Sequence, residues 1–234
     1  MVLDDTLAME DPMSDRGKTG NEPRVLSGWQ SLVIGALLLC GLTAAAVYAL
    51  MLGVARGHEI SYSEIRAASR LRGLCMGQMV FAAELVVDQD GDGKGEYGWM
   101  AEVAAAAPPR GRTEPLESAV VHRPLGNTGP HDGVVLHEGY CYVLYLPDGQ
   151  GNWTRETATV PALDPALADA QETDFRGYAW PAERGRTGWR CFAIDSTGTL
   201  RATSMDDPSA FSGVGDPPPA DKAFSSTTSW KTED

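Results

Sequence analysis

The chain has 234 residues, with 32 acidic and 19 basic side chains and a formal net charge of −13. This length leaves room for one modest soluble domain beside a membrane anchor, because domains cluster near roughly 100–150 residues. The acidic balance repels nucleic acid phosphates, so no nucleic-acid partner is expected.

An apolar stretch follows the polar N-terminal segment. No Asp, Glu, Lys, Arg or His occurs between Arg24 and Arg56, and residues 31–55 are apolar almost without interruption. A bilayer core of about 30 Å requires roughly 20 such residues in a helix, which satisfies every backbone polar group within one segment. A cleaved signal peptide is the alternative, but its apolar core is shorter and lies closer to the initiator Met. We expect a single transmembrane helix over 31–55, in contact with membrane lipid.

Residues 1–30 are polar, contain Pro12 and Pro23 and show no hydrophobic period, which predicts a disordered tail. The basic residues on the two sides of the anchor are balanced. The positive-inside rule therefore leaves the orientation of the anchor open.

The pattern after Arg56 is helical, because apolar residues recur at steps of three and four up to Val87. No proline interrupts the stretch from Ser31 to Val87. The whole stretch therefore predicts one long helix, or two nearly coaxial helices hinged between Gly53 and Gly57. The helix over 56–87 is expected to lay an apolar stripe on a soluble core and to end in the Asp/Gly-rich loop 88–96.

The remainder of the domain predicts a sheet. Residues 104–133 contain five prolines and predict a long loop. Short runs of β-branched and aromatic residues, separated by Gly-containing turns, then predict an antiparallel meander within 134–203. The strands are expected at 134–146, 175–180, 188–195 and 199–203. The whole domain is therefore an α+β ectodomain over 56–203.

The C-terminal segment and two cysteines add to this description of the domain. Residues 204–234 hold Pro217–Pro219 and many Ser and Thr residues, which predicts a second disordered tail. Cys141 and Cys191 lie in strand-like segments. They form either a disulfide, which would indicate an oxidising compartment, or two separately buried thiols, because the sequence does not show whether their side chains meet.

The order of elements resembles that of type IV pilins and type II secretion pseudopilins. Local strings are similar to those of pilin-like envelope proteins of planctomycete-type bacteria, at Asp90–Gly98, Gly139–Leu144, Tyr178–Pro181 and Gly185–Gly198. The resemblance implies a long membrane-anchored helix packed on a small antiparallel sheet. It also implies a bacterial inner-membrane location with an extracytoplasmic C-terminal domain, and pilin-like subunits or secretion machinery as partners.

One position departs from that family. Processed pilins are cut after a glycine, and the mature chain begins with an aromatic residue and carries Glu at its fifth position. Gly28–Trp29 imitates the cut, but Val33 stands where the Glu would be. We therefore expect the protein to retain its uncleaved N-terminal segment.

The loop 88–96 carries the clearest candidate for metal chemistry. Its aspartates alternate as in the first half of an EF-hand loop, and Ca²⁺ prefers six to eight hard oxygen ligands. Trp99 stands where a full EF-hand has its bidentate Glu, so the alternative is a solvated Asp/Gly turn. The expected calcium ligands are Asp88, Asp90, Asp92, the carbonyl of Lys94, and Glu96.

The sequence is poor in catalytic motifs. The four histidines lack the spacing of a zinc motif, and no Ser or Cys has a nucleophile motif around it. We therefore expect a structural or assembly component of a pilus or type II secretion apparatus and not an enzyme. The alternative is an independent, Ca²⁺-stabilised envelope binding module without a role in secretion.

Overall fold

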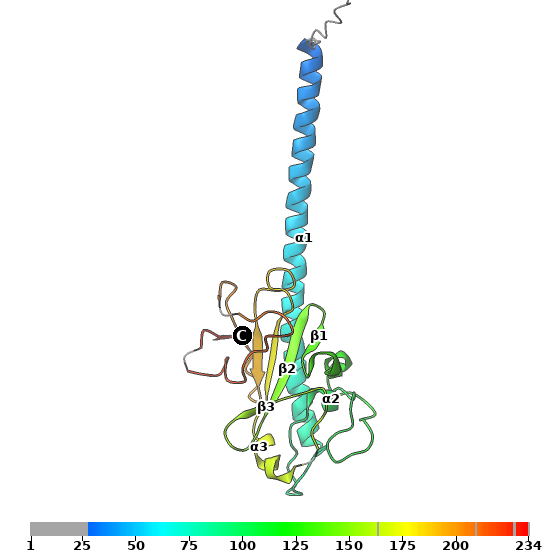
Figure 1. Cartoon of the computed structure of the whole chain (residues 1–234), viewed down its shortest axis with the longest axis vertical. Coiled ribbons are helices and arrows are strands. Elements are labelled where there is room, and N and C mark those ends of the chain that lie inside the picture. Colours follow the sequence, from blue (N-terminus) through cyan, green and yellow to red (C-terminus); the bar gives the residue numbers. More distant parts are fainter. Residues whose placement is uncertain (1–27, 163, 209, 227, 234) are drawn as a thin grey trace, which may run out of the picture. The chain divides into compact units, whose positions relative to one another are not determined.

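The structure is a computed structural model that describes residues 28–162, 164–208, 210–226 and 228–233. The chain divides into two compact units, one up to Leu50 and one from Met51 onward. Helix α1 (Gly28–Ala83) contributes residues to both units (Figure 1). Most of the tail predicted at 1–30 lies outside the described residues.

The first unit consists, in its described part, of the first turns of α1. Among the described residues α1 is the one helix that is long and apolar enough to cross a membrane, by length and composition, over Gly35–Ala83. Leu38 and Leu42 expose 64% and 69% of their surface, as do most large apolar side chains of this stretch. A core helix of a soluble protein would bury such side chains.

The structure has one continuous helix where the sequence left open a hinge between Gly53 and Gly57. A glycine inside a helix costs about 1 kcal/mol relative to alanine. That cost does not interrupt a helix whose flanking residues all favour it. No hinge is therefore present at these glycines.

In the second unit, α1 packs one face on the core. Ala67, Leu71, Leu74 and Phe81 are buried and recur at helical spacing. The helix ends at Ala83, earlier than the predicted Val87. Leu85 adopts a left-handed backbone with φ of 51°, which turns the chain while Val86 and Val87 still reach the core.

The sheet of the second unit is antiparallel throughout, with the order β1-β2-β4-β5-β6-β7 and with β3 paired to β2. A helix packed on a small antiparallel sheet confirms the α+β class. The strands are β1 (Val135–His137), β2 (Tyr140–Pro147), β3 (Trp153–Arg155), β4 (Arg176–Pro181), β5 (Phe192–Asp195), β6 (Arg201–Ala202) and β7 (Lys231–Thr232).

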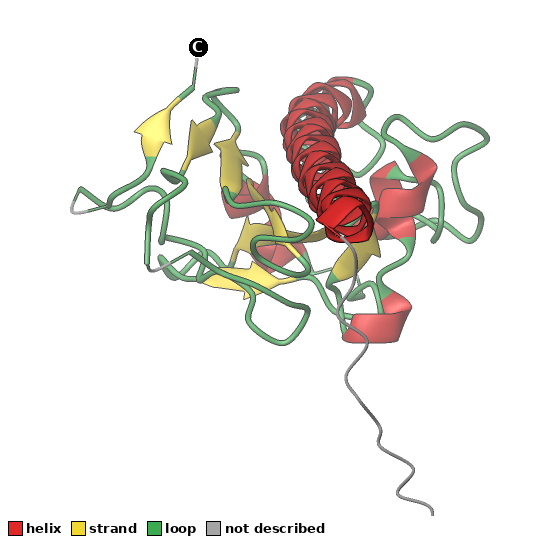
Figure 2. Ribbon diagram, turned by 90° about the horizontal axis from the view of Figure 1, so that it is seen from above, coloured by secondary structure: helices red, strands yellow, loops and turns green. Residues whose placement is uncertain are grey.

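Short helices lie in two connections, three of them between α1 and β1 and two between β3 and β4. Figure 2 shows them in red among the green loops around the yellow sheet. Two of the 3-10 helices, η1 and η2, lie within the loop predicted at 104–133. The helices are α2 (Met100–Val103), η1 (Arg123–Gly126), η2 (Gly129–His131), η3 (Pro165–Leu167) and α3 (Ala168–Gln171).

The strand predicted over 134–146 is a hairpin. β1 and β2 are joined by Glu138 and Gly139, whose φ angles are 45° and 80°. Two positive φ values are typical of the two-residue hairpin turn that prefers Asn-Gly. Glutamate at the first position hides that signal in the sequence.

β2 carries apolar side chains on both faces. Tyr142 and Leu144 face the cluster that includes α1. Val143 and Tyr145 face a second cluster, which contains Trp230. The sheet therefore needs a cover on each face.

The C-terminal segment provides the second cover. The side-chain hydroxyls of Tyr145 and Tyr178 donate to the carbonyls of Pro218 and Ala220, at 2.6 Å each, and β7 extends the sheet from β6. Figure 1 shows this red segment beside the strands. The disordered tail expected at 204–234 is therefore wrong for the described residues. The buried residues of the cover are Ala220, Ala223 and Trp230, and Phe211, Val214 and Phe224 pack beside them.

The cysteines are free thiols. Cys141 lies opposite Trp180 on β4, and Cys191 directly precedes β5 on the other side of β4. Two strand spacings separate their Cα atoms by about 10 Å, whereas a disulfide requires less than about 7 Å. Of the two alternatives, the disulfide between Cys141 and Cys191 is not formed and the two buried thiols are observed.

Candidate metal site in the acidic loop

The acidic loop folds around its own aspartates. Asp88 accepts hydrogen bonds from the backbone N–H groups of Gly91 and Gly93, at 2.8 and 3.3 Å. Asp90 and Asp92 each accept one from the N–H two residues later, at 3.1 and 2.8 Å. Such bonds are typical of Asx turns. They occupy one oxygen of Asp90 and hold its side chain in place.

A second segment brings two more carboxylates to this loop. Asp169 lies in α3 and Glu172 directly follows it. Each of Asp90, Asp92, Asp169 and Glu172 offers one oxygen, and these four oxygens lie within 4.8 Å of one another. Asp164 positions the segment, because its side chain accepts from Ala166 N–H at 3.1 Å and caps η3.

One ammonium group faces these carboxylates. Lys94 Nζ lies 2.6 Å from Asp92 Oδ2 and 3.4 Å from Glu172 Oε2. Its hydrogen bonds to the Asp92 carboxylate lower the pKa of Asp92. A single ammonium balances one of four carboxylates, so the cluster keeps a surplus of negative charge.

Glu172 shows the surplus most clearly. Its side chain is only 8% exposed, and its Oε1 is buried without a hydrogen-bond partner among the described residues. Desolvation and the charges of Asp92 and Asp90 raise its pKa, although Lys94 opposes them. A buried carboxylate oxygen without a partner is costly, and a bound cation would satisfy it.

The donor atoms define which cation fits. All four are carboxylate oxygens, the ligands that Ca²⁺ and Mg²⁺ prefer over imidazole or thiolate. Ca²⁺–oxygen distances of about 2.3–2.6 Å place opposite ligands about 5 Å apart. The four oxygens lie within 4.8 Å of one another, so they are close enough to share one ion. The group could therefore hold a metal ion.

The structure brings together only two of the five predicted ligands, Asp90 and Asp92. Both carboxylate oxygens of Asp88 accept hydrogen bonds from the loop backbone. Lys94 contributes an ammonium contact instead of a carbonyl ligand. Glu96 is fully buried and accepts from Gln89 N–H at 2.8 Å, so it is not a member of the cluster.

Sequence reasoning missed Asp169 and Glu172. The two acids stand three residues apart at a short helix, which places them on one side of it. That spacing was a usable signal. Their approach to a loop about eighty positions earlier depends on tertiary structure, which no local pattern encodes.

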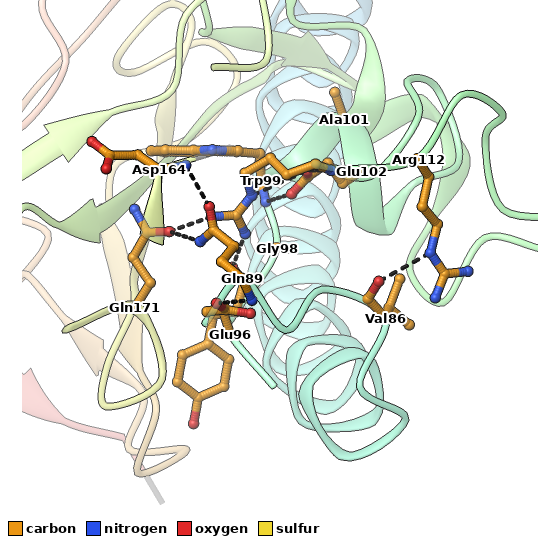
Figure 3. A network of polar contacts seen from close by, with 12 residues as sticks. Val86, Gln89, Glu96, Gly98, Trp99, Ala101, Glu102, Arg112, Asp164 and Gln171 are labelled. Carbon is orange, nitrogen blue, oxygen red and sulfur yellow. Dashed lines mark hydrogen bonds and ion pairs between the residues drawn. The ribbon is translucent and has the colours of Figure 1, made fainter. Parts of the chain in front are cut away.

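A buried polar network fastens the loop to the domain. Figure 3 shows Gln89 accepting from Asp164 N–H at 2.8 Å and approaching Gln171. The Arg110 guanidinium donates to Gln171 and to the Tyr97 carbonyl. These contacts anchor the acidic loop to the domain, and Arg110 and Gln171 are the buried members among them.

Two buried carboxylates complete this network. Arg110 Nε donates to Glu102 Oε1 at 3.2 Å, and Glu102 Oε2 accepts from Trp99 N–H at 2.7 Å. Glu156 accepts from the first two N–H groups of α2, at 2.7 and 2.9 Å. Full burial raises the pKa of Glu156 to about 8, and these two hydrogen bonds offset only part of that effect.

No protein-family model matches this sequence, and comparisons with curated proteins and with solved structures found no significant match.

Proposed function

We propose that this protein is a single-pass, pilin-like structural or assembly component of a bacterial pilus or type II secretion apparatus. In this proposal the anchor lies in the inner membrane and the second unit is extracytoplasmic. Ca²⁺ at Asp90, Asp92, Asp169 and Glu172 fastens the end of α1 to the rest of the domain.

One observation carries the proposal. A single helix, α1, combines an uncharged apolar stretch whose side chains are exposed with a later face that is buried against an antiparallel sheet. Exposed leucines cost free energy in water and none in lipid. Together with the strings at Asp90–Gly98 and Gly185–Gly198, this arrangement favours a membrane-anchored pilin-like protein.

The proposed Ca²⁺ site is supported by the arrangement of the carboxylates and not by the family resemblance. The acidic cluster joins the loop after α1 to the segment around α3, and the unpaired Oε1 of Glu172 faces no donor. A divalent cation there would link two chain segments that are distant in sequence. Its stabilising effect would be confined to the second unit.

The alternative function is an independent, Ca²⁺-stabilised envelope binding module. The observation that favours it is that every ligand of the cluster lies within the second unit. Such a module would keep its binding property after removal of residues 1–50. An assembly component would lose its role without the anchor.

Cys40 provides the test. It is the one exposed cysteine of the chain, because Cys75, Cys141 and Cys191 are buried. Mild oxidation of membranes should cross-link Cys40 between copies if the anchors pack side by side, and Cys40→Ser should abolish the cross-linked dimer. A protein that stays monomeric under oxidation, while its second unit still binds Ca²⁺, would support the alternative.

The orientation is tested in the same preparation. Protease added to intact spheroplasts should digest the second unit and leave the anchor protected. Protection of the second unit would contradict the proposed topology. A mature N-terminus at Trp29 would contradict the expectation from Val33 that the chain is not processed.

A further inference from the structure

Two histidines that are distant from the acidic loop in sequence meet at the edge of the sheet. His137 is the last residue of β1, and His122 immediately precedes η1. Their Nε2 atoms lie 3.1 Å apart, and their ring centroids are separated by 5.1 Å with an angle of 48° between the rings. Both ring edges therefore point at one position.

The backbone fixes both residues. His137 pairs with Tyr140 across the β1–β2 hairpin. Val120 and Val121, directly before His122, donate their N–H groups to the carbonyl of Val103, at 2.9 and 3.3 Å. The convergence of the two rings is thus built by two different parts of the domain.

We propose that His122 and His137 form a binding site for a transition-metal ion of the Zn²⁺, Cu²⁺ or Ni²⁺ class. Imidazole nitrogen is the ligand these ions favour. Metal–nitrogen distances of about 2.0–2.1 Å place two nitrogens about 2.9 Å apart at a right angle and about 3.4 Å apart at the tetrahedral angle. The observed 3.1 Å lies between these two values.

A carboxylate next to the pair supplies negative charge. Glu138 Oε1 lies 3.7 Å from His137 Nε2. The other oxygen, Oε2, accepts from Arg66 and Arg70 at 3.1 and 2.7 Å. Oε1 is thereby left facing the histidine. The two guanidinium groups oppose a cation, so the affinity should be moderate, with solvent completing the coordination.

This site differs from the acidic cluster in its donors. The cluster offers only carboxylate oxygens, whereas the histidine pair offers nitrogens. Excess Ca²⁺ should therefore occupy the cluster and leave the pair free. The alternative at the pair is an N–H···N hydrogen bond between the rings without metal binding.

The test uses the full chain in detergent, purified with a tag that lacks histidine and kept in excess Ca²⁺. Zn²⁺ binding is measured by calorimetry, and Cu²⁺ is used as a spectroscopic probe in electron paramagnetic resonance. The variants are His122→Gln and His137→Gln. His131→Gln and His58→Gln serve as matched controls, because both side chains are exposed and neither belongs to the pair.

We expect nitrogen hyperfine coupling from two imidazoles in the wild type and in both controls, and from one in each variant of the pair. The Zn²⁺ dissociation constant should rise by about tenfold or more in those variants. Circular dichroism should show that both variants stay folded. Absence of Zn²⁺ binding in the wild type, or binding that survives in both His122→Gln and His137→Gln, would overturn the site and leave only the hydrogen bond.

Discussion

Two groups of carboxylates in the second unit differ in how fully the protein compensates their negative charge. Glu102 and Glu156 are fully buried and receive backbone N–H donors, and Arg110 adds a guanidinium. Asp90 and Asp92 lie in an exposed loop, and among the described residues Lys94 pairs with Asp92 but not with Asp90. The buried group is satisfied by the protein itself, and the loop group keeps a charge surplus.

The difference separates a structural role from a binding role. A satisfied buried network holds the chain in one arrangement and has little to offer a ligand. An under-compensated cluster, with one buried unpaired oxygen on Glu172, gains free energy when a cation arrives. Substitutions in the first group should therefore change stability in all conditions, and substitutions in the second should change the response to Ca²⁺.

The largest effect is expected for Arg110→Met. The change leaves the Glu102 carboxylate buried without its counter-charge and removes donors to Gln171 and the Tyr97 carbonyl. Breaking a buried ion pair by removing one partner costs about 3–5 kcal/mol. Denaturant unfolding of the full chain in detergent measures this cost.

Arg112→Met is the matched control for that substitution. Arg112 is exposed, and its side chain donates a hydrogen bond to the Val86 carbonyl at 3.0 Å. Its loss should cost about 1 kcal/mol. Equal costs for the two variants would contradict the distinction between a buried network and the surface.

Calcium should give the next largest effect. Extracellular modules bind Ca²⁺ with dissociation constants of about 10⁻⁴ to 10⁻³ M, and a hundredfold excess over that constant adds about 2.7 kcal/mol to the free energy of unfolding. We expect a higher melting temperature of the full chain with Ca²⁺. Asp169→Asn and Glu172→Gln should abolish the rise.

Asp88→Asn distinguishes the two ligand sets. Asp88 accepts hydrogen bonds from the loop backbone and is not a member of the acidic cluster. This variant should therefore retain the response to Ca²⁺. Loss of the response in Asp88→Asn, together with its retention in Asp169→Asn, would restore the loop-only ligand set. An unchanged melting curve in the wild type would reduce the loop to a solvated turn.

A pH dependence should follow from Glu156. Its folded-state pKa is raised from the ordinary value of 4.5 to about 8 by burial, so the folded protein binds the proton more tightly than the unfolded chain. The stabilisation is complete below about pH 4.5 and is lost as pH rises through about 8. The slope approaches 1.4 kcal/mol per pH unit between these values.

Comparison with Glu156→Gln isolates this contribution, because other titrating groups remain in both proteins. The variant loses one acceptor for α2 and should be less stable in acid. The difference in stability between wild type and variant should shrink from pH 5 to pH 8. A difference that stays constant over this range would show that Glu156 is already ionised in the folded protein.

Patterns with a local cause were predictable from the sequence. The two-faced alternation of β2 shows in Tyr142 and Val143 because both faces of the strand are apolar. The hairpin before it was not predictable, because Glu138 occupies a left-handed position that the sequence does not announce. The cover provided by 204–233 was missed because its apolar residues, among them Ala220, Ala223 and Trp230, are few and follow no helix or strand period.

The candidate metal site was half predictable for the same reason. Asp90 and Asp92 belong to one loop whose spacing is visible in the sequence. Asp169 and Glu172 join them only because Gln89, Asp164 and Gln171 bring the two segments together. Long-range polar contacts of this kind leave no periodic signal.

The smallest effect is expected for Lys94→Met, and it probes the surplus charge directly. Lys94 Nζ contacts oxygens of Asp92 and Glu172 that Ca²⁺ would use, so the ammonium and the ion compete. Removing one positive charge about 4 Å from the doubly charged ion, in a solvent-like dielectric, should tighten Ca²⁺ binding about thirtyfold. The calcium-free protein should melt slightly lower, because four carboxylates then face no cation. Lys231→Met removes the same charge outside the loop and should leave the Ca²⁺ affinity unchanged. Weaker Ca²⁺ binding in Lys94→Met would mean that Lys94 supports the site, and the contrast between a self-satisfied and an under-compensated group would then fail.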